Sequence, residues 1–487
     1  MDGTEGYWLT RFVLQRGIGV IYFFAFLTAV NQFRPLLGEN GLLPAPLFLR
    51  QVGFRNAPSI FHLFPNDRAF ALFGRLGVVL SSVAITGLSE QFGTTFSVAV
   101  WGLLWIFYLS FVNVGQTFYA FGWESLLLES GFLAIFLGAA ETEPSVIIIW
   151  LMRWVLFRVM FGAGLIKVRG DPCWRDLSCL DYHFETQPMP NPLSWYFHRL
   201  PAWVRKAGVL FNHFVELVVP FAYFAPQPIA AIAGLLTILF QGSLIVSGNF
   251  SWLNHMTLVL AFSTFDDFLL RTLIPFGPSS LSPPSAVFGA AVWGVAILVA
   301  ILSVKPVRNL FSKNQVMNTI YNPFHLVNTY GAFGSITRPR YEIVLEGTDE
   351  KVPTTASWRE YEFKGKPGDI LHRPPQVAPY HLRLDWLMWF AAMPSRQLTY
   401  PPWLIHLVGK LLEGDGPTLA LLRKNPFPEA PPHYIRALTY HYRFTSPAER
   451  RQTGCWWRRE LVGTYLPPLS LEDAAFREIL KELKGRS

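Results

Sequence analysis

Apolar segments close to membrane length recur through the first two-thirds of the chain. A helix needs about 20 predominantly apolar residues to cross the hydrocarbon core of a bilayer. Segments near this length lie at Arg16–Val30, Leu76–Leu88, Phe96–Val114, Tyr119–Ala139, Val146–Val168, Val209–Phe224, Ile229–Val246, Leu253–Leu270 and Ala286–Val304. The pattern predicts a mainly α-helical, polytopic bundle with about nine membrane spans.

Two connections between these segments are too long to be simple turns. Residues 31–75 are punctuated by prolines, among them Pro44 and Pro58. Residues 169–205 contain the run Gln187–Pro192, in which alternate prolines prevent a continuous helix. We expect both loops to re-enter the bundle or to cap one end of it.

The hydrophobic period changes near Val304, which predicts a domain boundary. Residues 1–304 form the predicted transmembrane bundle, and residues 305–487 form a small, basic α+β domain that faces water. Alternation of apolar and polar residues indicates strands, whereas a longer apolar period indicates helices. The predicted strands are Arg340–Leu345, Trp358–Phe363, Tyr434–Phe444 and Trp456–Tyr465, and the predicted helices are Leu404–Leu412, Thr418–Leu422 and Leu471–Lys484.

Charge is scarce in this chain of 487 residues and unevenly distributed. Asp, Glu, Lys and Arg make up 15% of it, against about 25% in a soluble domain. Residues 1–304 hold 16 basic and 16 acidic side chains, and residues 305–487 hold 25 and 17, so the formal charge of +8 lies in the C-terminal part. The basic residues form no Lys/Arg run and accompany no nucleic-acid motif, so we expect them to face anionic membrane lipid and not nucleic acid.

The chain has three cysteines, which allow one disulfide at most. Cys173 and Cys179 are six residues apart and would close a small loop in an oxidising lumen or periplasm. In the cytosol they would remain thiols. The spacing alone leaves both states open.

Two neighbouring predicted spans carry opposite charges. Glu124 and Glu129 lie in one span, and Arg153 and Arg158 lie in the next. Because an unpaired charge is costly in lipid, we predict that these helices pack together with at least one charge-assisted contact. The alternative is a site for a proton or an anion. Lys167 ends the second span, where its ammonium group would reach the membrane interface.

Asn212, His213 and Glu216 share one face of a later predicted span. The His-x-x-Glu spacing matches half of a di-metal carboxylate motif, but a second half is missing. We therefore expect a hydrogen-bonded core cluster and no metal. No phosphate-binding loop or nucleophile elbow is present in the sequence, so it predicts no catalytic residue and no cofactor.

An aromatic run at Leu384–Ala392 contains Trp386, Trp389 and Phe390. These side chains predict an exposed ridge on which a partner protein could dock. The alternatives are a buried core segment or a segment at the membrane surface.

Five sequence blocks carry a family resemblance that extends from Asn31 to about Leu471. The blocks are Phe161–Pro192, Asn212–Leu217, Leu244–Asn249, Tyr330–Ile336 and Tyr380–Ala392. They resemble the lipase maturation factors. This resemblance implies a multi-pass protein of the endoplasmic reticulum membrane, or of the inner membrane in a bacterial relative. It also implies a non-enzymatic chaperone whose lumenal C-terminal part contacts its clients, dimeric secreted lipases, while they fold and assemble.

The predicted spans between Val209 and Val304 are even in number, so the segments before and after them lie on the same side of the membrane. If the C-terminal part is lumenal, Cys173–Leu180 and the C-terminal domain both lie on the non-cytosolic side.

A shorter similarity supports a second function. Phe161–Lys167, followed by Trp174, is similar to the Gly-x-x-Lys…Trp segment of vitamin K-dependent carboxylase and related membrane proteins. This similarity implies an intramembrane enzyme with Lys167 as general base and with Glu129, Arg158 and His213 around it. A hydrated cavity around Lys167 would favour the enzyme, and a dry, ion-paired interior would favour the maturation factor.

Overall fold

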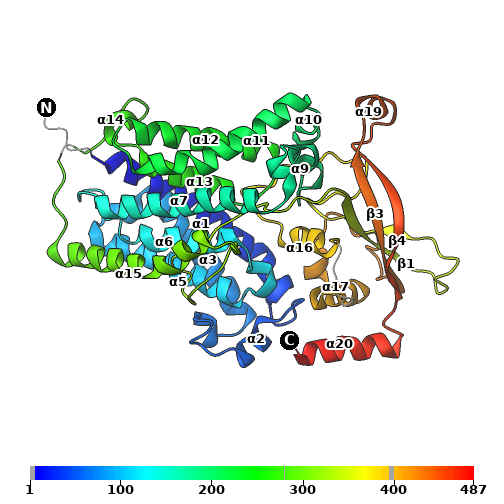
Figure 1. The fold of residues 1–487 in the computed structure, drawn as a ribbon. Coiled ribbons are helices and arrows are strands. Elements are labelled where there is room, and N and C mark those ends of the chain that lie inside the picture. Colours follow the sequence, from blue (N-terminus) through cyan, green and yellow to red (C-terminus); the bar gives the residue numbers. More distant parts are fainter. Residues whose placement is uncertain (1–5, 279, 394–399, 487) are drawn as a thin grey trace.

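A computed structural model describes residues 6–278, 280–393 and 400–486. Seven of the helices in these ranges are long and apolar enough to cross a membrane. They are α1 (Trp8–Leu37), α3 (Asp67–Thr86), α5 (Gly93–Val114), α7 (Val146–Arg169), α11 (Ala202–Leu217) with its 3-10 continuation Val219–Phe224, α12 (Ile229–Ser247) and α15 (Ala286–Phe311). They lie side by side in one bundle (Figure 1). The predicted multi-pass helical fold is confirmed.

Two of the nine predicted spans are shorter helices. They are α6 (Gly122–Ala134) and α13 (Leu253–Ala261). Nearly every residue of α6 is buried, and α13 packs against α1, α7 and α12. Both segments are apolar because other helices surround them, so hydropathy alone does not separate them from helices that face lipid.

The remaining helices of the N-terminal part are short. The structure contains α2 (Ala45–Gln51), α4 (Leu88–Gln91), α8 (Pro172–Arg175), α9 (Leu180–Thr186), α10 (Ser194–Phe197) and α14 (Asp267–Leu270), with 3-10 turns at Ile60–His62, Gln116–Tyr119 and Phe262–Thr264. Helices α9 and α10 belong to the 169–205 loop and lie at the end of the bundle that faces the sheet (Figure 1).

The C-terminal part contains a four-stranded antiparallel sheet in the order β2-β1-β3-β4. The strands are β1 (Arg340–Thr348), β2 (Arg359–Glu360), β3 (Tyr434–Phe444) and β4 (Trp457–Leu469), and the helices are α16 (Arg383–Ala391), α17 (Pro402–Leu412), α18 (Gly416–Leu419), α19 (Pro447–Thr453) and α20 (Ala474–Arg486). Each predicted strand and helix of this part overlaps an observed one. The small antiparallel sheet is thereby confirmed.

The helix bundle and the C-terminal part are not separated at the predicted boundary. Helix α15 continues to Phe311, beyond the predicted boundary at Val304. Downstream of it, the chain returns to the bundle. The carbonyl of Tyr330 lies so close to α7 that a Cβ added at Gly162 would be 2.5 Å from its oxygen. The division into residues 1–304 and 305–487 stays a prediction.

Candidate functional site

A wide groove lies between the 169–205 loop and the sheet. Its volume is about 880 Å³. The loop, the two residues before β1, the end of β3 and the start of β4 all contribute to it. Its acidic and basic lining residues are Asp181, Glu185, His198, Arg199, Arg338, His441, Arg443, Glu449 and Arg458. Two segments that are far apart in the sequence thus form one surface.

Hydrogen bonds fix the two walls of the groove to each other. The Arg340 guanidinium, at the start of β1, donates to the carbonyl oxygens of Glu185 (2.9 Å) and Pro188 (3.0 Å) in the loop. The Phe444 amide at the end of β3 donates to the Glu185 carboxylate at 2.7 Å. The indole of Trp195 donates to the Thr445 carbonyl at 2.9 Å. The groove is therefore part of one packed unit.

Arginines dominate the charge of the groove at neutral pH. Burial and the neighbouring Arg199 lower the pKa of His198 to about 4, so this imidazole is neutral at pH 7. Burial also raises the pKa of Glu185. Arg443 is exposed, and Arg458 shares only a half-exposed contact of 3.3 Å with Glu449. These two guanidinium groups can face a partner without first leaving a buried ion pair.

The Cys173–Cys179 segment lies beside the C-terminal part. The two cysteines are joined by a disulfide, and both are buried. The Trp174 indole donates to the Phe333 carbonyl at 2.8 Å, and Arg338 pairs with Asp171 at 2.7 Å. That ion pair holds the pKa of the Asp171 carboxyl well below its usual range. These contacts confirm that the segment and the C-terminal part lie on the same side of the bundle.

The position of Lys167 at the end of a span predicts a side chain that extends to the membrane interface, but the side chain is packed inside the protein. It is buried, and its ammonium group donates to Glu216 (2.6 Å) and to Asn212 (2.9 Å) on α11. The ammonium also lies 5.0 Å from the ring centroid of Trp174. Gly164 permits this close approach, because a Cβ there would be 2.9 Å from that of Glu216. Because Glu216 on α11 compensates its charge, the Lys167 side chain does not have to extend to the membrane interface.

The enzyme hypothesis requires one site that contains Lys167, Glu129, Arg158 and His213. The structure does not bring these four residues together. Glu129 pairs with Arg158, whereas the His213 imidazole donates to the Trp174 carbonyl at 2.9 Å. Arg158 and Lys167 are nine residues apart on α7, which is about 13.5 Å of helix. These four side chains do not converge on one reacting centre.

The predicted charge pairing between neighbouring spans is confirmed for Glu129 and Arg158. Their carboxylate and guanidinium groups form a buried ion pair, to which the Tyr330 hydroxyl adds a hydrogen bond of 2.7 Å. Arg153 instead donates to the Ser263 carbonyl at 2.7 Å. The polar interior of the bundle is thus completed partly by main-chain oxygens and by the C-terminal part.

The partner of Glu124 was not predictable from its neighbours in sequence. Arg383 of α16 donates to the Glu124 carboxylate at 2.7 Å and to the Phe118 carbonyl at 2.7 Å. Both charged side chains are fully buried. The Asn249 side chain makes a similar connection, since its oxygen accepts from the Val377 amide at 2.7 Å. Asn249 and Arg383 lie in the sequence blocks Leu244–Asn249 and Tyr380–Ala392. The sequence of these blocks does not show which distant residues they contact.

The aromatic run on α16 is not an exposed ridge. Trp386 is buried and packs edge-on against Trp123 with ring centroids 4.9 Å apart. Trp389 is half-buried and donates to the Thr186 carbonyl at 3.0 Å. Only Phe390 has a largely exposed side chain. The run is mostly core because α16 fills the space between the bundle and the sheet.

Comparisons with known proteins cover almost the whole chain. The family model described as the lipase maturation factor transmembrane domain matches residues 9–272, and that described as the lipase maturation factor C-terminal domain matches residues 326–467. The chain is 45% identical to lipase maturation factor 1 of Homo sapiens, over 96% of this chain and 89% of that protein. It is 46% identical to the Mus musculus protein of the same name, over 96% and 88%.

More distant relatives carry a second name. Lipase maturation factor 2 of Xenopus laevis is 31% identical, over 97% of this chain and 84% of that protein. No solved structure matches the chain significantly. Both family models and relatives well above 30% identity agree, and the chain belongs to the lipase maturation factor family.

Proposed function

We propose that this multi-pass membrane protein is a non-enzymatic maturation factor, a chaperone that helps secreted dimeric lipases to fold and assemble. The names of its relatives supply the class of client. The observation that carries a docking function is the groove between the 169–205 loop and the sheet, with Arg443 and Arg458 at its rim. We propose this groove as the client-contacting surface.

The groove suits a folding client for electrostatic reasons. Rim charges steer association and select partners, while contributing little to the stability of the protein that carries them. Four arginines face three carboxylates across the groove, and its two histidines have lowered pKa values. The favoured partner is therefore an acidic, partly structured segment of the client.

Buried Lys167 supports the non-enzymatic function. A general base needs an amine that faces a substrate. The Lys167 ammonium instead donates to Glu216 and Asn212 inside the bundle. A lysine that balances a buried carboxylate serves the packing of α7 on α11.

We further propose that the protein resides in the endoplasmic reticulum membrane, with the groove in the lumen. Disulfides persist in oxidising compartments and are rare in the cytosol. The Cys173–Cys179 disulfide lies beside the groove, on the same side of the bundle as the sheet. A lumenal groove would meet lipases before they leave the secretory pathway.

The test is lipase maturation in cells that lack their own maturation factor. The full chain is co-expressed with a secreted dimeric lipase, and secreted lipase activity is measured against secreted lipase mass. We expect the wild type to raise this ratio, and Arg443→Glu with Arg458→Glu to reduce the gain by about ten-fold, which corresponds to roughly 1.4 kcal/mol of binding.

Arg477→Glu on α20 is the control, because it reverses one positive charge, as each groove substitution does, at an exposed residue that does not line the groove. It should leave the gain unchanged. A groove variant that is present at wild-type level and matures lipase normally would refute the groove as the client surface. A wild-type chain without any effect would refute the maturation function itself.

A further inference from the structure

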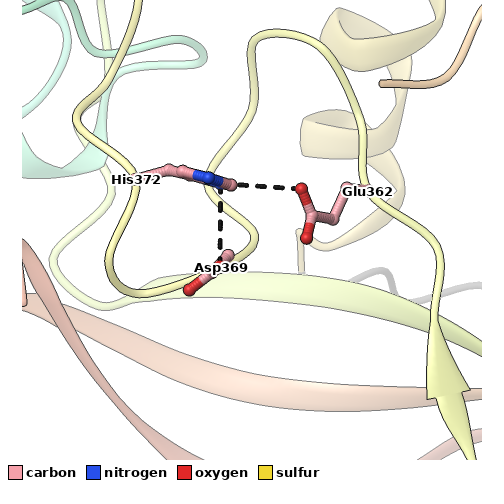
Figure 2. Close-up of side chains that lie close together, drawn as sticks. All are labelled: Glu362, Asp369 and His372. Carbon is pink, nitrogen blue, oxygen red and sulfur yellow. Dashed lines mark ion pairs between the residues drawn. The ribbon is translucent and has the colours of Figure 1, made fainter. Parts of the chain in front are cut away.

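Three potential metal ligands lie together on the segment between β2 and α16. Glu362, Asp369 and His372 each direct a donor atom toward the same space, and these atoms lie within 4.8 Å of one another (Figure 2). The His372 Nδ1 atom is 3.5 Å from a Glu362 carboxylate oxygen and 3.8 Å from an Asp369 carboxylate oxygen. All three residues are half-buried.

The His372–Glu362 separation is longer than a good hydrogen bond and matches two donors of one zinc ion, and the His372–Asp369 separation is slightly longer still. Good N–H···O hydrogen bonds have donor–acceptor distances of about 2.7–3.2 Å. Donors at about 2.0–2.2 Å from a tetrahedral zinc ion lie about 3.3–3.6 Å from each other. Moreover, the His372 Nδ1 atom is shielded from solvent and makes no hydrogen bond within the described part of the chain. The Nδ1 atom is therefore free to coordinate an ion in the tautomer that carries its proton on Nε2.

A small cavity adjoins these donors. Glu362, Asp369 and His372 all line it, and it has about 20 Å³ of free space, which is room for a single water molecule or ion. The cavity is thus the right size for a bound ion and too small for an organic ligand.

Three of the four Lys and Arg side chains that line the cavity are engaged elsewhere, and the fourth, Arg423, is exposed. Lys366 pairs with the buried Glu342 at 2.9 Å, and Arg373 donates to the Pro192 carbonyl at 2.9 Å. Lys424 approaches Glu362 at 3.8 Å, but its side chain is 62% exposed. Because an exposed pair contributes little, a divalent ion can displace this lysine at low cost.

We propose that Glu362, Asp369 and His372 form a zinc-binding site with a fourth position open to water. An imidazole combined with two carboxylates favours zinc over magnesium and calcium, which prefer oxygen ligands alone.

The ion would cross-link the two ends of the 362–372 segment, because all three ligands belong to it. The same segment already accepts hydrogen bonds at the Ile370 carbonyl from the amides of Trp456 and Trp457. Its Glu362 pairs with Lys424 in an isolated antiparallel bridge. A zinc ion would therefore stabilise the region where β4 begins, next to Arg458.

The test uses the full chain purified in detergent and stripped with a chelator. Zinc chloride is titrated by calorimetry, and bound metal is counted by mass spectrometry after desalting. We expect one zinc per chain, no comparable binding of magnesium, and a rise of the thermal unfolding midpoint with zinc. Loss of even an outer-shell partner weakens metal binding by roughly 10–100-fold, so His372→Gln should weaken it by more than about ten-fold.

His433→Gln is the control, since His433 is exposed and outside the cluster. Glu362→Gln preserves side-chain shape and provides the same test if His372→Gln does not fold. A wild-type chain that binds no zinc overturns the proposal. So does zinc binding that survives both cluster variants unchanged, because the ion would then be held elsewhere. Neither result bears on lipase maturation, which is measured separately.

Discussion

Charged side chains serve opposite purposes in the helix bundle and on the outer surface of the sheet. In the bundle, Glu124, Glu129 and Lys167 are buried, and each is paired with a residue from another element. On the sheet, the side chains of the pairs Arg359–Asp349 and Arg458–Glu449 are about half exposed. The same chemical groups therefore determine packing in one region and remain accessible to a partner in the other.

The energetic contrast follows from solvation. Removal of one partner from a buried pair leaves an uncompensated charge and costs about 3–5 kcal/mol. An exposed pair contributes about 0–1 kcal/mol because water and salt screen it. We therefore expect bundle substitutions to destabilise the fold strongly, and surface substitutions to change recognition while the protein keeps its stability.

The largest effect is expected at Arg383. Arg383→Met removes the partner of the fully buried Glu124 and should destabilise the protein by about 3–5 kcal/mol. The measurement is the yield of monodisperse protein after detergent extraction. Arg443→Met, the same change at an exposed arginine, should give a normal yield. A normal yield of the Arg383 variant would mean that α16 does not depend on the bundle.

The next effect is expected at Lys167. Lys167→Met strands the Glu216 carboxylate and should cost about 3 kcal/mol. The double variant Lys167→Met with Glu216→Met should recover most of the loss, because it removes both charges. Thermal unfolding of the three proteins measures this coupling.

Lys167→Arg distinguishes a lysine that stabilises packing through an ion pair from a lysine that acts as a general base. It keeps the positive charge, so it should retain most of the stability and most of the lipase maturation. If Lys167→Arg were folded and abundant but wholly inactive, the general-base hypothesis would replace the maturation factor.

A smaller effect is expected from acid. Burial, assisted by the charge of Lys167, lowers the pKa of His183 to about 4, whereas an unfolded histidine has a pKa of about 6.5. Between these values the unfolded chain binds the extra proton, so stability falls as the pH falls from 6.5 to 4. At pH 5 the loss is about 2 kcal/mol.

The unfolding midpoint of His183→Gln should consequently fall less between pH 7 and pH 5 than that of the wild type. Equal slopes for the two proteins would show that His183 does not carry the acid sensitivity.

In this chain, sequence periodicity predicts the helices and strands well, but it predicts poorly which distant side chains pair with each other. Alternation places Tyr434–Phe444 in a strand with the observed bounds, because one face of β3 is buried. Neighbouring spans with opposite charges predict the Glu129–Arg158 pair for a similar local reason. Glu124 and Arg383, by contrast, are 259 residues apart. A polar position in a span indicates that a partner is needed, but not which distant segment supplies it.

The groove shows the same limit. Its walls come from the 169–205 loop and from strands more than 100 residues later. Proline spacing in Gln187–Pro192 predicts a non-helical loop, yet the loop becomes one wall of the groove only through the contacts of Arg340 with its main chain and of Phe444 with Glu185. Tertiary contacts of this kind leave no periodic signal.

The smallest effect is expected at the exposed pair of β2. Asp349→Asn removes the carboxylate that accepts from Arg359 at 2.6 Å, but both side chains are largely exposed. We expect the unfolding free energy to change by less than about 0.5 kcal/mol. Arg359→Ala should cost slightly more, because its guanidinium also lies 4.0 Å from the ring centroid of Phe427. Thermal unfolding at low and high salt measures both. A loss above about 2 kcal/mol for Asp349→Asn would show that this surface charge also fixes packing, and the contrast between the bundle and the sheet would then fail.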